Sequence, residues 1–244
     1  MMKSKMRKLM IAMVAILPLA LASCHDEFMF GISGQGEIVQ QTISTDNFDG
    51  FVSAIAADIY VAQGETLKVE IEAQQNIIDN IDFDQVVDGI WTIHYHEMVR
   101  YSKPVKIYIT MPTLTMAGIS GSGKIEGITA FKGLEKLHLV ISGSGNIDLE
   151  TESKLLDVII SGSGEMLLSG NTEKLNLLIS GSGGFHGTAL STTKAETTIS
   201  GSGSARITVE EQLNALISGS GSIFYAGNPD LDVHVSGSGR VVRQ

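Results

Sequence analysis

The second half of the chain alternates hydrophobic and polar residues in short, regularly spaced runs. The sequence ISGSG begins at Ile119 and five more times after it, and VSGSG begins at Val235. In the five residues that end on the first letter of each late copy, nearly every second residue is apolar. Clear examples are Leu137, Leu139 and Ile141; Leu156, Val158 and Ile160; Leu175, Leu177 and Ile179; Leu213, Ala215 and Ile217; Leu231, Val233 and Val235. A period of two predicts a strand with one buried face.

A second apolar position follows each Gly-Ser run, six residues after its first letter. These residues are Ile125, Ile147, Met166, Phe185, Ala205, Ile223 and Val241. Each repeat therefore predicts a strand, a turn, a second strand and a return loop.

The repeats recur with a period close to 20 residues. The serines that open them are Ser120, Ser142, Ser161, Ser180, Ser200, Ser218 and Ser236. Such a period is typical of a solenoid, whose units bury their apolar faces only by stacking. We therefore expect an all-β, single-stranded β-helix or β-solenoid of about 20 residues per coil, with SGSG corners between two main sheets.

The glycines of each SGSG fall on inward or corner positions if the alternation continues through the turn. The two sheets converge there, and glycine also permits a positive φ at a sharp bend. The serine side chains point outward, where their hydroxyls can form hydrogen bonds to one another or to unpaired backbone groups. The predicted turn residues are Gly121, Gly123, Gly143, Gly145, Gly162, Gly164, Gly181, Gly183, Gly201, Gly203, Gly219, Gly221, Gly237 and Gly239.

One outward column is unusually apolar. The residue just before the opening Ile of the turn is Val140, Ile159, Leu178, Thr198 or Leu216 in five successive repeats. A long exposed apolar stripe is typical of a binding or oligomer face. Alternatively, these residues stabilise their strand ladder, or another segment covers them.

Residues 37–115 have no SGSG period but also read as strands. The segments are 37–44, 51–55, 58–63, 67–73, 90–96 and 105–111, with hairpin turns at 62–66 and 87–91 and a helical turn at 76–81. This segment predicts a cap, either sandwich-like or made of irregular first coils, because a bare end coil would expose its core and its strand edge. At the other end, Arg240 and Arg243 either blunt the edge by their charge, or the edge pairs with another chain.

The first residues have the pattern of an export signal. Lys3, Lys5, Arg7 and Lys8 precede an apolar run at 9–22, which is shorter than the ~20 residues of a membrane span. The run ends in LASC, which resembles the bacterial lipoprotein box and implies cleavage before Cys24 and lipidation of that cysteine. Cys24 is the one cysteine, so no disulfide forms within a chain. The expected organisation is a signal peptide (1–23), a lipidated tether (24–36), a cap (37–115) and the solenoid (116–244).

Charge and composition narrow the possible partners. With 43% hydrophobic and 18% charged residues, the chain is not of the disordered class. Removal of the four basic residues before Cys24 leaves 13 Lys and Arg against 27 Asp and Glu, a net charge of −14, which excludes nucleic-acid binding. Asp26 and Glu27 resemble a surface-export signal of some Gram-negative lipoproteins, or they belong to a solvated tether.

Three motifs resemble ligand-binding sites, but each lacks a residue that its ligand would require. The run GISGSGKI resembles a P-loop, but Ile125 replaces the magnesium-binding Ser or Thr and no helical pattern follows. The run GSGNIDL resembles a calcium-binding nonapeptide, but Asp148 has no counterpart in the other repeats. His94 and His96 share one strand face, without a third metal ligand that the sequence places beside them. We therefore expect no cofactor and no metal.

The sequence also lacks a catalytic set. The outward polar residues are scattered, and they include no Ser-His-Asp combination and no paired carboxylates of the kind that polysaccharide-cleaving β-helices use. The period of six that marks hexapeptide acyltransferases is absent. We therefore predict that the protein is not an enzyme.

The combination of motifs resembles the head GIN domain family, autotransporter-like adhesins of Gram-negative bacteria. The matching pieces are the lipoprotein box, GISGQGEI, DIYVAQGETLKVEIEA, NIIDNI, VDGIWTI and the seven late repeats. The resemblance implies a β-helix of the pectin-lyase-like class with GSG at tight turns between two sheets. It also implies adhesion without catalytic residues, so no site residue is carried over.

Together these features predict a non-catalytic lipoprotein of the outer membrane, held by a lipid on Cys24 and exposed at the cell surface. It would bind a glycan or a protein of a host surface, and it could form a homo-oligomer. The alternatives are a periplasm-facing structural or partner-binding protein and, less in keeping with the sequence, a polysaccharide-active enzyme.

Overall fold

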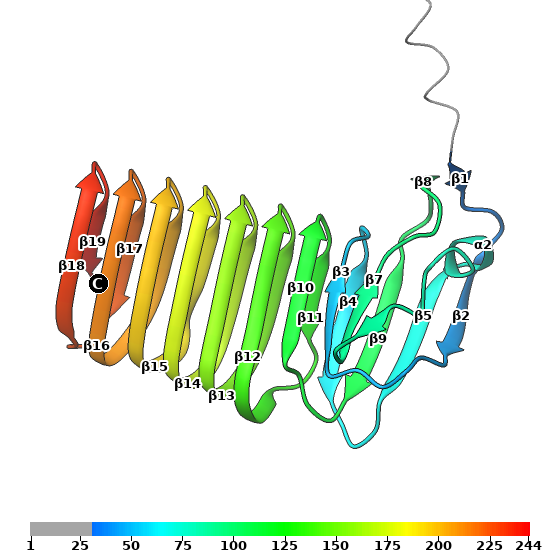
Figure 1. Ribbon diagram of the computed structural model, residues 1–244, viewed down its shortest axis with the longest axis horizontal. Helices are drawn as coiled ribbons and strands as arrows, with labels where there is room; N and C mark the ends of the chain where they lie inside the picture. Colours follow the sequence, from blue (N-terminus) through cyan, green and yellow to red (C-terminus); the bar gives the residue numbers. More distant parts are fainter. Residues whose placement is uncertain (1–30) are drawn as a thin grey trace, which may run out of the picture.

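The structure is a computed structural model that describes residues 31–244. It is a flattened β-solenoid whose coils stack side by side along one long axis (Figure 1). The signal peptide, Cys24 and the acidic pair at 26 and 27 lie outside the described residues. Within residues 31–244, no helix is long and apolar enough to span a membrane.

Long strands that bend at the coil corners form the regular part of the stack. They are β12 (Phe131–Gly143), β13 (Asn146–Gly162), β14 (Glu165–Gly181), β15 (Gly184–Gly201) and β16 (Ser204–Gly219). Each has two arms. The arms that end at SGSG form one layer, which we call sheet I, and the arms that begin after SGSG form the other, sheet II. All neighbouring coils pair in parallel, with Ser142 beside Ser161 and Ser161 beside Ser180.

The inward residues of both sheets form one continuous core. Leu156, Val158 and Ile160 of sheet I are at most 1% exposed, and so are Met166 and its counterpart Ile147 in sheet II. The alternating pattern therefore predicted the core correctly, and the predicted solenoid with SGSG corners between two layers is confirmed.

Backbone hydrogen bonds join the SGSG turns of neighbouring coils. The Ser163 N–H donates to the Gly143 carbonyl at 2.9 Å, and the Glu165 N–H donates to the Gly145 carbonyl at 3.2 Å. Gly162 has a φ of 124°, a backbone conformation that favours glycine. A Cβ on Gly164 would lie 2.5 Å from both the Gly145 carbonyl oxygen and the Ile141 Cγ2. The first glycine thus makes the bend, and the second lets adjacent coils approach.

The stack continues into the N-terminal segment in an order that differs from the sequence. Strands β10 (Met116–Gly121) and β11 (Lys124–Gly127) pair on one side with β12 and β13. On the other side they pair with β3 (Gly50–Ser53) and β4 (Asp58–Gln63), which pair in turn with β7 (Ile90–Ile93) and β9 (Lys106–Met111). The coil made by 50–63 therefore lies between two coils that come later in the chain.

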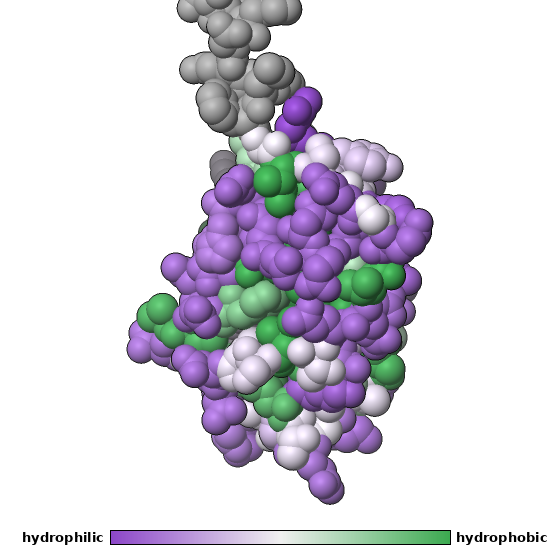
Figure 2. Space-filling model, turned by 90° about the vertical axis from the view of Figure 1, so that its right-hand side faces the viewer, coloured by the Kyte–Doolittle hydropathy of each residue, from purple (hydrophilic) through white to green (hydrophobic). Residues whose placement is uncertain are grey.

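The N-terminal end of the stack is covered. Strand β5 (Lys68–Gln74) pairs antiparallel with β9, and β2 (Ile38–Ile43) pairs antiparallel with β5. The short helix α2 (Gln75–Ile78) buries Ile77 and Ile78 against the core. Strand β6 (Val86–Val87) borders β7, and β1 (Ile32–Ser33) pairs with β8 (Val99–Tyr101). Figure 2 shows this end as a mostly hydrophilic surface with scattered hydrophobic residues.

A buried glutamine ties the chain's entry to the cap. Gln74 is only 3% exposed. Its Nε2 donates a hydrogen bond to the Gly36 carbonyl at 3.1 Å, and its Oε1 accepts one from the Lys103 N–H at 2.9 Å. Nearby, Trp91 packs between Phe48 and Phe83, with ring centroids 5.3 and 6.1 Å away. All six strand segments predicted before residue 115 contain strands, and the segment predicted as 90–96 ends at Ile93.

The C-terminal end of the stack is open within the described residues. It consists of β17 (Ser222–Ala226), β18 (Asp230–Gly237) and β19 (Arg240–Arg243). Strand β18 pairs with β16, and β19 pairs with β17. The inward residues Leu231, Val233 and Val235 are 47%, 39% and 42% exposed because no further coil covers them.

Candidate binding face

The predicted contact stripe lies in register on the outer surface of sheet I. Val140 is beside Ile159, Ile159 beside Leu178, Leu178 beside Thr198, and Thr198 beside Leu216. Ile159, Leu178 and Leu216 are 38%, 40% and 48% exposed. Thus no segment within residues 31–244 buries this stripe, and the contacts between its members leave much of the Ile159, Leu178 and Leu216 side chains open.

A polar column lies two residues before the stripe on the same face. In register it consists of His138, Asp157, Asn176, Glu196 and Asn214. The two columns enclose a shallow hollow of about 340 Å³ lined by Asp157, Ile159, Asn176, Leu178 and Thr198 among others. From the sequence alone, the outward polar residues His138, Asp157, Asn176, Glu196 and Asn214 were expected to be scattered over the surface. The parallel register brings them together, because each coil repeats the same parity.

Asp157 is the centre of the polar column. It accepts from Asn176 Nδ2 at 2.7 Å, and its Oδ2 lies 3.0 Å from Lys136 Nζ and 3.4 Å from His138 Nε2. Burial raises the pKa of Asp157, but the hydrogen bonds from Asn176 and Lys136 and the charges of Lys136 and His138 outweigh it, so the pKa lies below its usual value. The carboxylate is thus ionised and held in place by three neighbouring residues.

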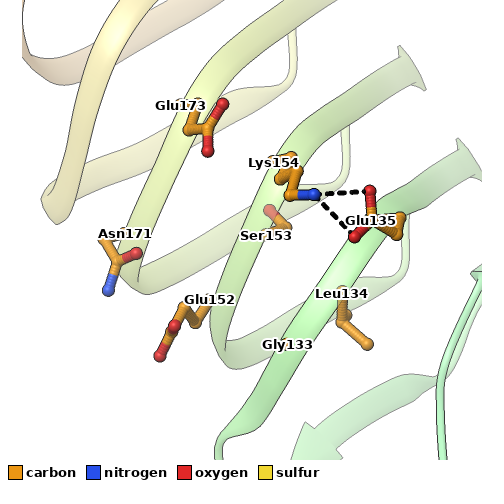
Figure 3. Close-up of a pocket in the computed structure, with 8 residues that line it drawn as sticks. All are labelled: Gly133, Leu134, Glu135, Glu152, Ser153, Lys154, Asn171 and Glu173. Atoms are coloured by element: carbon orange, nitrogen blue, oxygen red, sulfur yellow. Dashed lines mark hydrogen bonds and ion pairs between the residues drawn. The ribbon is translucent and has the colours of Figure 1, made fainter.

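A second hollow, of about 190 Å³, lies at the return corner of the coils. Figure 3 shows its lining residues, with Lys154 pointing to Glu135 of the preceding coil. Lys154 Nζ bonds the two Glu135 oxygens at 2.7 and 2.9 Å, and this bond and charge raise the pKa of Lys154. The lysine is already paired with a carboxylate. We therefore interpret this hollow as a solvated corner with an ion pair between coils.

The structure places the P-loop-like run on two strands and a turn. Its lysine, Lys124, lies in β11 and contacts Glu126 at 2.6 Å, so no helix N-terminus faces a phosphate site. Asp148 lies on the outer surface of sheet II between Glu126 and Leu167 in the neighbouring coils. A run of calcium ligands does not continue through this column.

The two adjacent histidines meet one carboxylate. Asp82 Oδ2 lies 3.5 Å from His94 Nε2 and 3.9 Å from His96 Nδ1. No group of three or more His, Cys, Asp or Glu placed to hold a metal ion occurs in the part of the chain that the structure describes. The other His–carboxylate pairs, such as His186 with Glu165 at 2.6 Å, lie on outward faces. Across residues 31–244, none of these imidazoles bonds a serine or threonine hydroxyl.

The arrangement of coils, turns and cap is shared with known proteins. The family described as "Putative auto-transporter adhesin, head GIN domain" matches residues 47–229, which is most of the chain. The chain belongs to this head GIN domain family. The resemblance inferred from the sequence motifs is therefore confirmed.

Solved structures share the fold of this head GIN domain protein. The crystal structure of a putative adhesin from Bacteroides fragilis has a TM-score of 0.82 at 24% identity, and the match covers 88% of this chain and 100% of the other. A putative lipid binding protein from Parabacteroides distasonis gives 0.73 at 22%, covering 87% and 99%. A putative adhesin from Parabacteroides merdae gives 0.71 at 22%, covering 87% and 98%. A search of curated proteins finds no match to the chain.

Proposed function

We propose that this protein is a non-catalytic adhesion module that binds its ligand on the outer surface of sheet I. The observation that carries the proposal is the exposed stripe in register beside an ordered polar column across successive coils. Soluble proteins rarely leave a long row of aliphatic side chains open without a partner. Family membership supports adhesion as the role.

A glycan fits the chemistry of this face. Sugar hydroxyls can donate to the Asp157 and Glu196 carboxylates, while the C–H faces of the rings pack on Ile159 and Leu178. Because the coils repeat at ~4.8 Å, an extended ligand meets the same pair of columns again in each coil. A site of this kind gains affinity by repetition rather than by one deep pocket.

The proposed location is the outer face of the outer membrane. The lipoprotein box supports lipidation of Cys24, and multiple acyl chains are enough for stable anchoring. In Figure 1, β1 lies at the edge of the stack where the SGSG turns are. A tether leaving there would hold sheet I perpendicular to the membrane, with its outer surface open to the medium.

Two substitutions of similar exposure on opposite faces test the binding surface. Leu178→Asp changes the stripe, and Leu167→Asp changes an equally aliphatic residue of the same strand, 48% exposed, on sheet II. On a glycan array and in whole-cell adhesion assays, we expect Leu178→Asp to reduce binding at least tenfold and Leu167→Asp to leave it unchanged. Equal loss in both variants, or in neither, would show that sheet I is not the contact surface.

Protease and antibody access on intact cells tests the location. We expect the described domain to be cleaved and labelled without permeabilising the cells. Protection until the outer membrane is opened would instead support the periplasm-facing structural role, and crosslinking would then identify the partner.

A further inference from the structure

We propose that the ribbon formed by β1 and β8 is a second membrane contact, in which Met98 and Tyr101 enter the interfacial region of the bilayer and Arg100 meets its phosphate groups. Met98 and Tyr101 are 73% and 70% exposed, more than any other large hydrophobic side chain of residues 31–244. Neither belongs to the stripe on sheet I, so the proposed adhesion surface does not account for them.

Hydrogen bonds fix this ribbon at the start of the described chain. The Ile32 N–H donates to the Met98 carbonyl at 2.9 Å, and the Gly34 N–H donates to the Tyr101 carbonyl at 2.7 Å. In Figure 1, β1 and β8 lie together at the edge of the stack where the SGSG turns are. The two exposed side chains are therefore held beside the segment that joins Cys24 to β1.

The position of Cys24 selects the bilayer as the occupant. Cys24 precedes Gly31 by seven residues, so even a fully extended chain places it within about 25 Å of β1. Linking two contacts over so short a distance raises the effective concentration of the second one to about the millimolar range, so a contact too weak to form alone is still made. This argument rests on the lipidation of Cys24, which is part of the proposed function, but it does not depend on the adhesion surface.

The two exposed side chains suit the boundary between lipid and water. Tyrosine is enriched at this depth of membranes because its ring is apolar and its hydroxyl is polar. Methionine adds a flexible apolar chain that adapts to an irregular surface. Insertion of Met98 and Tyr101 would remove from water an apolar surface that residues 31–244 leave uncovered, which favours the contact.

Arg100 adds a positive charge at the same place. Its side chain lies against the start of β1, since a Cβ on Gly31 would be 3.0 Å from Arg100 Cγ. None of the ion pairs among residues 31–244 includes Arg100, whereas the nearby Lys103 is paired with Glu37 at 2.7 Å. The chain is acidic overall, so anionic headgroups repel most of its surface. The Arg100 guanidinium can instead bind a headgroup phosphate and so orient the ribbon towards the bilayer.

Short-range fluorescence quenching by brominated lipids tests the contact. The full lipidated chain is placed in vesicles of phosphatidylethanolamine and phosphatidylglycerol with brominated acyl chains. Its one native tryptophan, Trp91, is buried and supplies the background. We expect the added emission of Met98→Trp and of Tyr101→Trp to fall at least twofold relative to vesicles without bromine. The control is Ile128→Trp, at a 58% exposed residue that follows β11 at the opposite edge of the coils, and its emission should not change.

Each other result would overturn the membrane contact. Equal quenching at all three positions would show that the protein touches lipid without using the ribbon. If Met98→Trp and Tyr101→Trp are not quenched but emit at shorter wavelength, another part of the chain covers the ribbon. Mass spectrometry of the same sample separates this contact from the anchoring: acylated Cys24 without quenching refutes the contact alone, and a chain without acyl groups refutes both.

Removing one positive charge tests the role of Arg100. In the Tyr101→Trp chain, Arg100→Gln should reduce the quenching at least twofold in the same vesicles, because the phosphate contact is lost. Lys132→Gln, at an exposed residue near the start of β12, should leave the quenching unchanged. Equal effects of the two substitutions, or no effect of Arg100→Gln, would show that Arg100 does not bind the headgroups. Neither result bears on glycan binding by sheet I.

Discussion

At the scale of single residues, the two glycines of each SGSG turn have different tasks. The first, such as Gly162, has a positive φ and lies in the bend at the edge of the stack. The second, such as Gly164, is buried and leaves room for the Ile of the preceding coil. The intervening Ser163 points outward and is tied to the previous coil by its backbone N–H. The turn thus requires glycine at both positions, whereas the position between them accepts a side chain.

Replacing the second glycine by valine should therefore weaken the whole coil. In Gly164→Val, the new Cβ would lie 2.5 Å from a backbone carbonyl oxygen that cannot move without separating the coils. We expect a loss of about 3 kcal/mol or more in the free energy of unfolding, measured by urea denaturation. Ser163→Val, one residue away and exposed, should change this free energy by less than about 0.5 kcal/mol. Similar losses in both variants would contradict the distinct role of the second glycine.

The sequence predicted which residues of each repeat face inward, because parity is a local property. Ile160, Met166 and the other periodic apolar residues are buried as expected. The exposure of Leu231 and Val233 in β18 does not follow from their own pattern, which is that of every earlier coil, although an open edge at this end was expected from the sequence. Their exposure depends on whether another coil packs beside β18, and the sequence of the repeat itself does not determine this. The hydroxyl ladder suggested for the serines was also unnecessary, because backbone bonds join the turns.

At the scale of strands, side chains of successive coils form ladders that run across the sheet. In sheet I, Lys136, Asp157 and Asn176 belong to three neighbouring coils and meet at the Asp157 carboxylate. Lys174 and Glu196 continue the ion pairs along the same face at 2.7 Å. Such ladders add specificity of register to the apolar stacking, because a slipped coil would separate these partners.

The lowered pKa of Asp157 makes this ladder depend on pH. Since the pKa is lower in the folded than in the unfolded chain, the ionised carboxylate stabilises the fold above its ordinary pKa of 3.8. That stabilisation is lost as the pH falls through the folded pKa. We expect Asp157→Asn to destabilise the protein by about 1 kcal/mol at pH 7, with the difference vanishing near pH 2. Thermal unfolding between pH 7 and pH 2 measures this difference in stability, and Asp148→Asn at an exposed position is the control. A difference that does not change with pH would count against an ionised Asp157.

The N-terminal strands were predictable one by one, but their arrangement was not. Alternation located β4 and β9, and the turn signal near Gly89 located the β6–β7 hairpin. The hairpin predicted at 62–66 was wrong, because β9 lies between β4 and β5 and pairs with both. The coil formed by β3 and β4 lies between two later coils, one formed by β7 and β9 and the other by β10 and β11. This order depends on contacts between segments that are distant in the sequence. A single sequence carries no signal for such pairings. The candidate binding face was predicted in part: the stripe was identified, whereas the polar column became visible only through the register of the coils.

At the scale of the whole molecule, the regular coils act as interchangeable layers. Strands β13, β14 and β15 each pair with one coil on either side. The free energy of such a stack is approximately a sum of coil terms and nearest-neighbour interfaces. The two ends, in contrast, are different in kind: one is covered by β2, β5 and α2, and the other is open within the described residues.

Removing one whole coil should leave a folded protein. Deleting residues 162–180 joins Ser161 to Gly181, which occupy consecutive positions because Ser161 and Ser180 are in register. We expect a cooperatively folded β protein, shorter by about 4.8 Å in solution scattering, with both ends unchanged. Deleting residues 171–180 removes about half a coil and should yield no cooperative transition. If the shorter deletion folds as well as the longer one, the coil is not the unit of this structure.

The position of β3 and β4 between two later coils affects how the chain can fold during its synthesis or export. Strands β3 and β4 find their partners only in β7, β9, β10 and β11, all of which follow them in the chain. A polypeptide that emerges N-terminus first must therefore hold Phe51, Ile59 and Val61 without any partner strand until β7 and β9 have emerged, and without a partner on their second side until β11 ends at Gly127. Every later coil, from β12 onward, emerges beside a completed surface and can add to it at once. Assembly is thus delayed at its beginning and sequential afterwards, so the apolar strands of the first coil are exposed for longer than those of any later repeat.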